Sequence, residues 1–227
     1  MEAENTIQIE QIRTSRGALI NYCYLIVNAV SKSAIVVDPA WDASAIQKQL
    51  MKHGVDLAGV LVTHHHVDHM HLAQEFADYY NCKIYISEIE YSFYKLEIHR
   101  MFPLHDLTET VIGDICILPI VTPGHTAGST CFLAGNALFT GDTLFNEGCG
   151  LCSGWGADPV EMYASLRKIK KLVPDSVKIY PGHRYYSDLG KTFAEVKKIN
   201  IYLQIDNQDQ FVQFRMRKTR KSMFSFS

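Results

Sequence analysis

The sequence lacks the features that would assign it to a membrane or secreted class. Among its 227 residues, no apolar run approaches the ~20 residues that a membrane-spanning helix needs. The first residues, MEAENTIQIEQIRTS, contain no basic segment followed by an apolar core, so no secretory signal is predicted. We therefore expect a cytoplasmic protein that does not contact a membrane.

A charge excess and a disulfide framework are also missing. The 22 lysine and arginine residues balance 24 aspartate and glutamate residues, so the overall field is weak and no nucleic-acid partner is expected. The six cysteines are scattered through a chain too long to need covalent support, which favours reduced thiols. Cys149 and Cys152 form a CxxC pattern, but no βαβ unit surrounds it, which favours ordinary loop cysteines over a redox pair.

No segment rich in glycine, serine or proline divides the chain. The sequence therefore predicts a single domain over residues 1–227, with a C-terminal helix and a basic tail in 188–227. Short apolar runs alternate with helical patterns, which is typical of an α/β protein with mixed β-sheets. The predicted strands lie at 21–29, 33–40, 57–62, 83–87, 115–121, 129–135, 136–141 and 177–180. The predicted helices lie at 44–54, 71–81, 158–173 and 191–204.

Two segments carry more specific expectations. The helix at 158–173 begins with the capping residue Asp158, a proline and a glutamate at capping-box spacing. Its buried stripe is expected to contain Val160, Tyr163, Leu166, Ile169 and Val173. Residues 91–107 look irregular and apolar, and they either cover a bound acyl chain or belong to the core.

Histidine is concentrated in one short segment of the sequence. Half of its ten histidines lie between His64 and His71, within and beside THHHVDH. This motif directly follows a predicted strand, and so do three others: TPGH, TGD and YPGH. Strand ends are where rigid scaffolds present reactive side chains. The residues delivered this way are His64, His66, Asp68, His69, His125, Asp142 and His183.

Imidazole and carboxylate groups in this number predict a metal centre. A lone PGH or GD is more often an ordinary turn, whereas packing alone does not require the HxHxDH pattern. Zinc, iron or manganese suits these ligands, and seven ligands exceed one site but fit two metals that share a bridge. Only a carboxylate bridges with two oxygens, so Asp142 is the expected bridge. One metal would then take His64, His66 and His125, and the other Asp68, His69 and His183.

The four motifs THHHVDH, TPGHT, FTGDTLF and YPGHR resemble, in order, those of the metallo-β-lactamase superfamily, over residues 17 to 186. This resemblance implies an αββα four-layer sandwich, two Zn²⁺ ions and hydrolysis by a metal-bridging hydroxide, with Fe or Mn as alternatives to zinc. Asp68 would be catalytic as well as a ligand, because it can orient the nucleophile. A thiolate leaves without a dedicated acid, so a thioester suits the site.

Within the superfamily, the chain resembles the glyoxalase II group, the hydroxyacylglutathione hydrolases. Tyr185 matches a tyrosine of that group, but Leu151 stands where it commonly has a basic residue that holds glutathione. His71 replaces a glycine of the group and is a further candidate for substrate contact.

The whole chain, including GCGLC and the terminal NIYLQ and FRMRK segments, is more similar to the stand-alone zinc hydrolases of bacterial trans-acyltransferase polyketide clusters. That similarity implies release of acyl groups from an acyl carrier protein. The basic run 167–171 and the tail could meet an acidic carrier; the tail's basic residues are Arg215, Arg217, Lys218, Arg220 and Lys221. The alternatives are a glutathione thioester substrate, or a non-catalytic carrier-binding accessory protein with a structural metal.

Overall fold

Two six-stranded β-sheets form the centre of the molecule, for which a computed structural model describes residues 7–217. The first sheet has the order β1-β2-β3-β4-β5-β6. Its strands are β1 (Ile7–Arg16), β2 (Leu19–Asn28), β3 (Ser33–Val37), β4 (Asp56–Leu61), β5 (Lys83–Ser87) and β6 (Met101–Leu104). Strands β1 to β3 pair antiparallel and β3 to β6 pair parallel, so this sheet is mixed, as predicted.

The second sheet has the order β12-β11-β10-β9-β8-β7. Its strands are β7 (Thr110–Ile112), β8 (Ile115–Val121), β9 (Thr130–Ala134), β10 (Ala137–Gly141), β11 (Lys178–Pro181) and β12 (Lys191–Thr192). Strand β9 pairs antiparallel with both β8 and β10, and β10 pairs parallel with β11. Strands β8, β10 and β11 therefore end at the same edge of this sheet.

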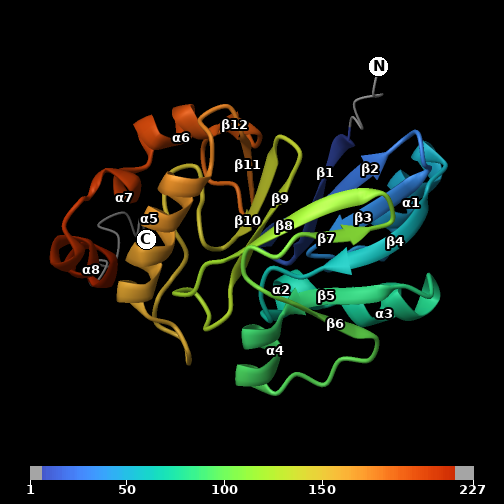
Figure 1. Ribbon diagram of the computed structural model, residues 1–227, viewed down its shortest axis with the longest axis horizontal. Helices are drawn as coiled ribbons and strands as arrows, with labels where there is room; N and C mark the ends of the chain where they lie inside the picture. The colour runs from blue at the N-terminus through green and yellow to red at the C-terminus, as the bar shows by residue number, and fades with distance from the viewer. Residues whose placement is uncertain (1–6, 218–227) are drawn as a thin grey trace, which may run out of the picture.

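Helices cover the outer face of each sheet, which gives the four layers seen in Figure 1. The first sheet carries α1 (Ala43–His53), α2 (Val67–Met70), α3 (Ala73–Tyr79) and α4 (Glu88–Tyr94). The second carries α5 (Pro159–Leu172), α6 (Phe193–Ile199), α7 (Ile201–Gln204) and α8 (Gln208–Met216). None of the helices in residues 7–217 is both long and apolar enough to cross a membrane.

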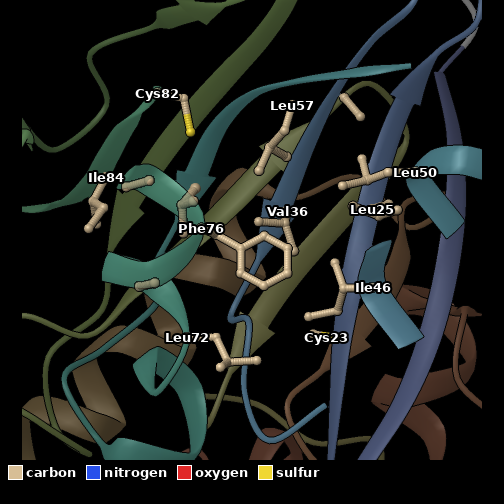
Figure 2. Packing of buried hydrophobic residues seen from close by; sticks show 14 of the residues in the cluster. Cys23, Leu25, Val36, Ile46, Leu50, Leu57, Leu72, Phe76, Cys82 and Ile84 are labelled. Atoms are coloured by element: carbon tan, nitrogen blue, oxygen red, sulfur yellow. The ribbon is translucent and has the colours of Figure 1, made fainter. Parts of the chain in front are cut away.

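Three apolar clusters hold the layers together. Figure 2 shows the first, in which Phe76 of α3 and Ile46 of α1 point toward Val36 of β3. The second lies between the other sheet and α5 to α8, and the third fills the space between the two sheets. All five residues of β3 are buried, because one face packs on helices and the other on the opposite sheet. This continuous apolar run explains why the strand was predictable.

The prediction of irregular structure over 91–107 is wrong in part. Helix α4 extends to Tyr94, and residues 101–104 form β6 at the edge of the first sheet. Pro103 is compatible with a strand there because an edge strand needs only one set of hydrogen bonds. Leu96, Ile98 and Met101 pack against the first apolar cluster, which favours the core interpretation of this stretch.

The single helix predicted over 191–204 is also wrong. Residues 191–192 form β12, and Asn200 then separates α6 from α7. Asn200 is fully buried with an extended backbone, and its side chain caps α7 while donating to the carbonyls of Phe145 and Gly148. These hydrogen bonds outweigh the helical preference of the flanking residues.

Two smaller corrections concern β1 and the stripe of α5. The ten-residue strand β1 pairs along its whole length with β2 and was not predicted. In α5, Asp158 caps the helix as expected, whereas Val160 is exposed and Met162 is buried in its place. The tail residues Lys218, Arg220 and Lys221 lie outside the residues that the structure describes.

Candidate metal centre

The seven predicted ligands converge at one edge of the two-sheet core. His64 and His66 follow β4, and Asp68 and His69 lie in α2. The other three follow strands of the second sheet: His125 comes after β8, Asp142 after β10 and His183 after β11. Each side chain therefore stands on the end of a buried strand or one short turn beyond it. The fold brings residues 119 positions apart into one cluster (183 − 64 = 119).

Three histidine nitrogens form the first group, which contains His64, His66 and His125. Nδ1 of His66 lies 3.0 Å from Nε2 of His64 and 3.0 Å from Nε2 of His125. All three nitrogens lie close enough to one another to hold one metal ion. His64 and His125 are buried, whereas His66 is partly exposed, so the group is open on one side.

The second group contains Asp68, His69 and His183. Oδ2 of Asp68 lies 3.4 Å from Nε2 of His183 and 3.7 Å from Nε2 of His69. These atoms also lie close enough to one another to hold a metal ion. The Asp68 carboxylate is held in place by Asn21 of β2, whose side-chain amide donates to Oδ2 at 3.0 Å.

Asp142 lies between the two groups. Its Oδ2 is 3.6 Å from Nε2 of His125 and 3.5 Å from Nε2 of His183. Its Oδ1 is 3.3 Å from Nε2 of His69. A carboxylate in contact with ligand atoms of both groups has the position that a bridge requires. The roles of the seven residues as ligands, and of Asp142 as a bridge, remain predictions.

Hydrogen bonds at the far ring nitrogens fix the orientation of the histidines. Nδ1 of His125 donates to the Leu151 carbonyl at 2.7 Å, and Nδ1 of His183 donates to the Ile20 carbonyl at 2.8 Å. Nδ1 of His69 lies 2.9 Å from Oδ2 of Asp38. A ring that donates at Nδ1 carries its lone pair on Nε2, which is the atom that faces the cluster in each case.

Asp38 connects the two groups from behind. Besides His69, it accepts hydrogen bonds from the backbone N–H and the hydroxyl of Thr63. The Thr63 hydroxyl lies 3.0 Å from Nδ1 of His64, so one buried carboxylate orients a histidine of each group. These contacts indicate that Asp38 supports the site rather than reacting in it.

The local chemistry fits metal ions. Nε2 of His69 and Oδ1 of Asp142 are buried and have no hydrogen-bond partner among the described residues. Such unmatched buried atoms are costly unless another group satisfies them, and a cation can coordinate both. Space is also reserved for these side chains, because a Cβ at Gly182 would lie 2.4 Å from the His69 ring and 2.8 Å from Oδ1 of Asp142.

The histidines of the two groups differ in the direction in which the site shifts their pKa. Burial, reinforced by the neighbouring histidines, lowers the pKa of His66 to about 4 and that of His64 well below its usual range. For His183 burial acts the same way, but hydrogen bonds to Asp142 and Asp68 outweigh it and raise the pKa to about 10. The first group therefore offers neutral imidazoles at neutral pH, whereas a metal ion in the second group has to displace a proton.

Sequence reasoning missed Glu90, a fully buried glutamate of α4. Its Oε1 accepts from the backbone N–H of His65 at 2.8 Å and lies 2.7 Å from the His65 ring. Its Oε2 accepts from the Thr126 hydroxyl at 2.9 Å and from the N–H of Gly128 at 2.8 Å. One carboxylate thus ties the loop of His64 and His66 to the loop of His125. A lone glutamate in a seven-residue helix gave no sequence signal for this role.

The remaining histidines of the motif lie outside the cluster. His65 points away from the cluster, and its ring stacks on Tyr94 with centroids 3.7 Å apart. His71 is exposed and lies beside Trp41, with ring centroids 5.0 Å apart. Trp41 donates to Asn21, so His71 connects to Asp68 only through two intervening side chains.

A cavity of about 600 Å³ opens over the metal centre. His125, Asp142 and His183 lie in its wall, together with the predicted substrate residues Leu151 and Tyr185. His71 is not part of this wall, and neither is any residue of 91–107. Leu151 is 65% exposed and Tyr185 is 59% exposed, so both can contact a ligand that enters the cavity. Their roles in substrate binding remain predictions.

Comparison with known proteins agrees with this architecture. The family model described as Metallo-beta-lactamase superfamily matches residues 16–183. Among solved structures, a metallo-beta-lactamase from Staphylococcus aureus superposes with a TM-score of 0.83 at 24% identity, covering 95% of this chain and 69% of the other. ETHE1 from Myxococcus xanthus superposes with a TM-score of 0.79 at 24% identity, covering 92% and 89%. These structural likenesses show the fold.

Curated relatives cover the chain almost completely. It is 40% identical to a probable polyketide biosynthesis zinc-dependent hydrolase, BaeB, of Bacillus velezensis, over 98% of this chain and 99% of the relative. It is 31% identical to a probable hydroxyacylglutathione hydrolase of Schizosaccharomyces pombe, over 97% of this chain and 87% of the relative. The motifs, the four layers and the family match agree: the chain belongs to the metallo-beta-lactamase superfamily.

Proposed function

We propose that this metal-dependent hydrolase cleaves the thioester bond of acyl groups carried on the phosphopantetheine arm of an acyl carrier protein. The observation that carries the proposal is the arrangement of six ligand-type side chains around Asp142, open to a cavity of about 600 Å³. A purely structural metal site closes with four ligands and needs no cavity. Seven ligands at an open cavity instead suit a pair of metal ions that acts on a substrate.

Two zinc ions bound there would supply a Lewis acid for the carbonyl oxygen and a water of lowered pKa. The chain's own contribution is orientation. Asn21 holds the Asp68 carboxylate beside His183, and in the proposed mechanism Asp68 accepts a hydrogen bond from the attacking water. A thiolate needs little protonation on departure, so the chemistry does not require a separate general acid.

The carrier substrate is supported by the relatives that match from end to end. Besides BaeB, the chain is 39% identical to a probable polyketide biosynthesis zinc-dependent hydrolase, PksB, of Bacillus subtilis, over 97% of this chain and 98% of the relative. By contrast, a hydroxyacylglutathione hydrolase of Tolumonas auensis extends well beyond the match, which covers 68% of it. The apolar Leu151 in the cavity wall also disfavours a charged tripeptide next to it.

A glutathione thioester is the second candidate. It is favoured by Tyr185, which lies in the cavity wall with its ring centroid 5.3 Å from that of Phe145, and by the fission-yeast relative. A non-catalytic carrier-binding protein is the third candidate, and the open cavity beside the ligands argues against it.

Competition between substrates tests the proposal. Zinc-loaded protein would be given the same acyl group on an acyl carrier protein, on coenzyme A and on glutathione, and kcat/KM would be measured for each. We expect the carrier thioester to be hydrolysed fastest, by at least about tenfold, which corresponds to about 1.4 kcal/mol. Preference for the glutathione thioester would establish the second candidate, and absence of hydrolysis with full metal loading would establish the third.

A further inference from the structure

The last helix of the described chain brings an arginine into the wall of the active-site cavity. Arg215, in the final turn of α8, lines the same cavity as His125, Asp142 and His183. Its Nη1 donates to the hydroxyl of Tyr202 at 3.1 Å, which fixes the guanidinium relative to α7. Its Nε is buried and has no hydrogen-bond partner among residues 7–217. The cavity wall therefore contains a positively charged guanidinium group.

The charge of Arg215 is not neutralised by the surrounding structure. The basic residues of α5 are different: Arg167 pairs with Asp206, and Lys168 lies 2.7 Å from Asp106. Arg184, at the cavity wall, pairs with Asp188 at 2.6 Å. No such ion pair involves Arg215 or Arg217 in the described part of the chain. Arg167, Lys168 and Lys170 of α5 thus have internal carboxylate partners, whereas these two arginines have none among the described residues and are available to an anionic ligand.

A second hollow lies on the other side of Leu151 and Arg215. It has a volume of about 250 Å³, and its wall includes Ser153, Tyr202 and Arg217. It shares only Leu151 and Arg215 with the main cavity. Leu151 and Arg215 therefore stand where the two hollows adjoin. Arg217 lies at the far wall, with its guanidinium 3.6 Å from the centroid of the Phe214 ring.

We propose that Arg215, with Arg217, forms a subsite for the phosphate group on the thiol arm of the substrate. The inference rests on the proposed function, which supplies a thiol arm whose outer end is a phosphate ester. Guanidinium groups bind phosphate with two parallel hydrogen bonds, and they do so best where water is partly excluded. Leu151 contacts the uncharged part of the arm, and the second hollow holds its charged end.

Two substrates that differ only in this phosphate test the subsite. The same acyl group would be presented on pantetheine and on 4′-phosphopantetheine, and the ratio of their kcat/KM values would be measured. We expect the wild-type protein to prefer the phosphorylated substrate by about tenfold or more, as charged hydrogen bonds of this kind allow. In Arg215→Met the ratio should fall to near one, and Arg215→Lys should restore part of it.

The matched control is Arg167→Met, which removes an arginine that lines neither hollow and should leave the wild-type ratio unchanged. A wild-type ratio near one, or an unchanged ratio in Arg215→Met, would overturn the subsite, whereas the proposed function is tested separately by the competition between carrier, coenzyme A and glutathione thioesters. A second result would also overturn the subsite. If hydrolysis of an S-acylglutathione depends on Arg215 while the phosphate has no effect, Arg215 binds a carboxylate of glutathione instead.

Binding measured without turnover separates the two proposals. Calorimetry with pantetheine and 4′-phosphopantetheine measures how much the phosphate contributes to affinity. It does so even in a protein that hydrolyses neither thioester. We expect the phosphate to tighten binding about tenfold in the wild-type protein and in Arg167→Met, but not in Arg215→Met. Equal affinities for both ligands in the wild-type protein would contradict the subsite.

Discussion

At the scale of single residues, the site is defined as much by the partners of the ligands as by the ligands. The sequence revealed the seven ligand-type residues because histidine and aspartate crowd after strands without any packing reason. It did not reveal that Asp38 orients His64 through Thr63 and orients His69 directly. Such partners are ordinary residues, and only the fold places them behind a ligand. Sequence alone therefore locates the candidate ligands better than the residues that support them.

Glu90 provides a prediction at this scale. Glu90→Ala removes the link between the loops that carry the first group, so we expect zinc affinity at one site to fall about 10–100-fold while the other is retained. Zinc titration against a chromophoric chelator resolves the two affinities. Glu90→Gln should retain part of the affinity, because its amide oxygen can still accept from one loop.

The control for Glu90 is Glu88→Ala, in the same helix, whose carboxylate pairs with His105 at the surface. This variant should bind zinc as the wild-type protein does. Equal weakening of both sites in Glu90→Ala, together with a lower melting temperature, would instead show a purely structural role.

At the scale of elements, the helices and strands that were predicted correctly are those with a clear local signal in the sequence. Helix α1 was predicted to within one residue at each end, and the glycine that marks its end, Gly54, adopts the left-handed conformation; the cap at its start, Asp42, was not part of the prediction. Strands β3, β4, β8 and β10 were found because they are short continuous apolar runs. Helix α4 and strand β6 were missed because neither is long enough for a period to emerge, and their ends are set by the sheet edge.

The cap of α1 gives a pH-dependent prediction. Hydrogen bonds from Ser44 and from the N–H of Ala45 hold the pKa of Asp42 below its usual value. The folded state therefore favours the ionised carboxylate, and its stabilisation is complete above the unfolded-state pKa and lost as pH falls through the lower folded-state pKa. Asp42→Ala should reduce the free energy of unfolding by about 1 kcal/mol at pH 7.

That difference between the wild-type protein and Asp42→Ala should shrink below about pH 4, as measured by denaturant titration at several pH values. Lys48→Ala, at an exposed position of the same helix, should change stability by less than about 0.5 kcal/mol at every pH. A stability loss in Asp42→Ala that grows as the pH falls would contradict the capping role.

The interruption between α6 and α7 is a second element that can be tested. Asn200→Ala would leave the buried carbonyl of Phe145 without this donor and remove one of two hydrogen bonds to the carbonyl of Gly148, which costs about 2–3 kcal/mol. Because Phe145 and Gly148 line the cavity, we also expect KM to rise more than kcat falls. An unchanged KM in a destabilised variant would show that Asn200 supports the fold without shaping the cavity.

At the scale of the whole molecule, the metal centre exists only because two sheets meet. The first sheet and α2 deliver His64, His66, Asp68 and His69, and the second sheet delivers the other three. The sequence predicted this convergence from the repeated strand-then-ligand pattern, and family and fold class are confirmed. It could not predict the path of the C-terminal helices, because the position of Arg215 depends on how α8 packs against α5.

The central claim is that one cluster, divided by Asp142, holds a pair of metal ions. The most direct measurement is the zinc content of the full chain after equilibration with excess zinc and removal of unbound metal, compared between the wild-type protein and Asp142→Ala. We expect two zinc ions per wild-type chain, with Asp142→Ala losing at least one of them and nearly all thioester hydrolysis. One zinc ion per wild-type chain, or full occupancy and turnover in Asp142→Ala, would contradict it.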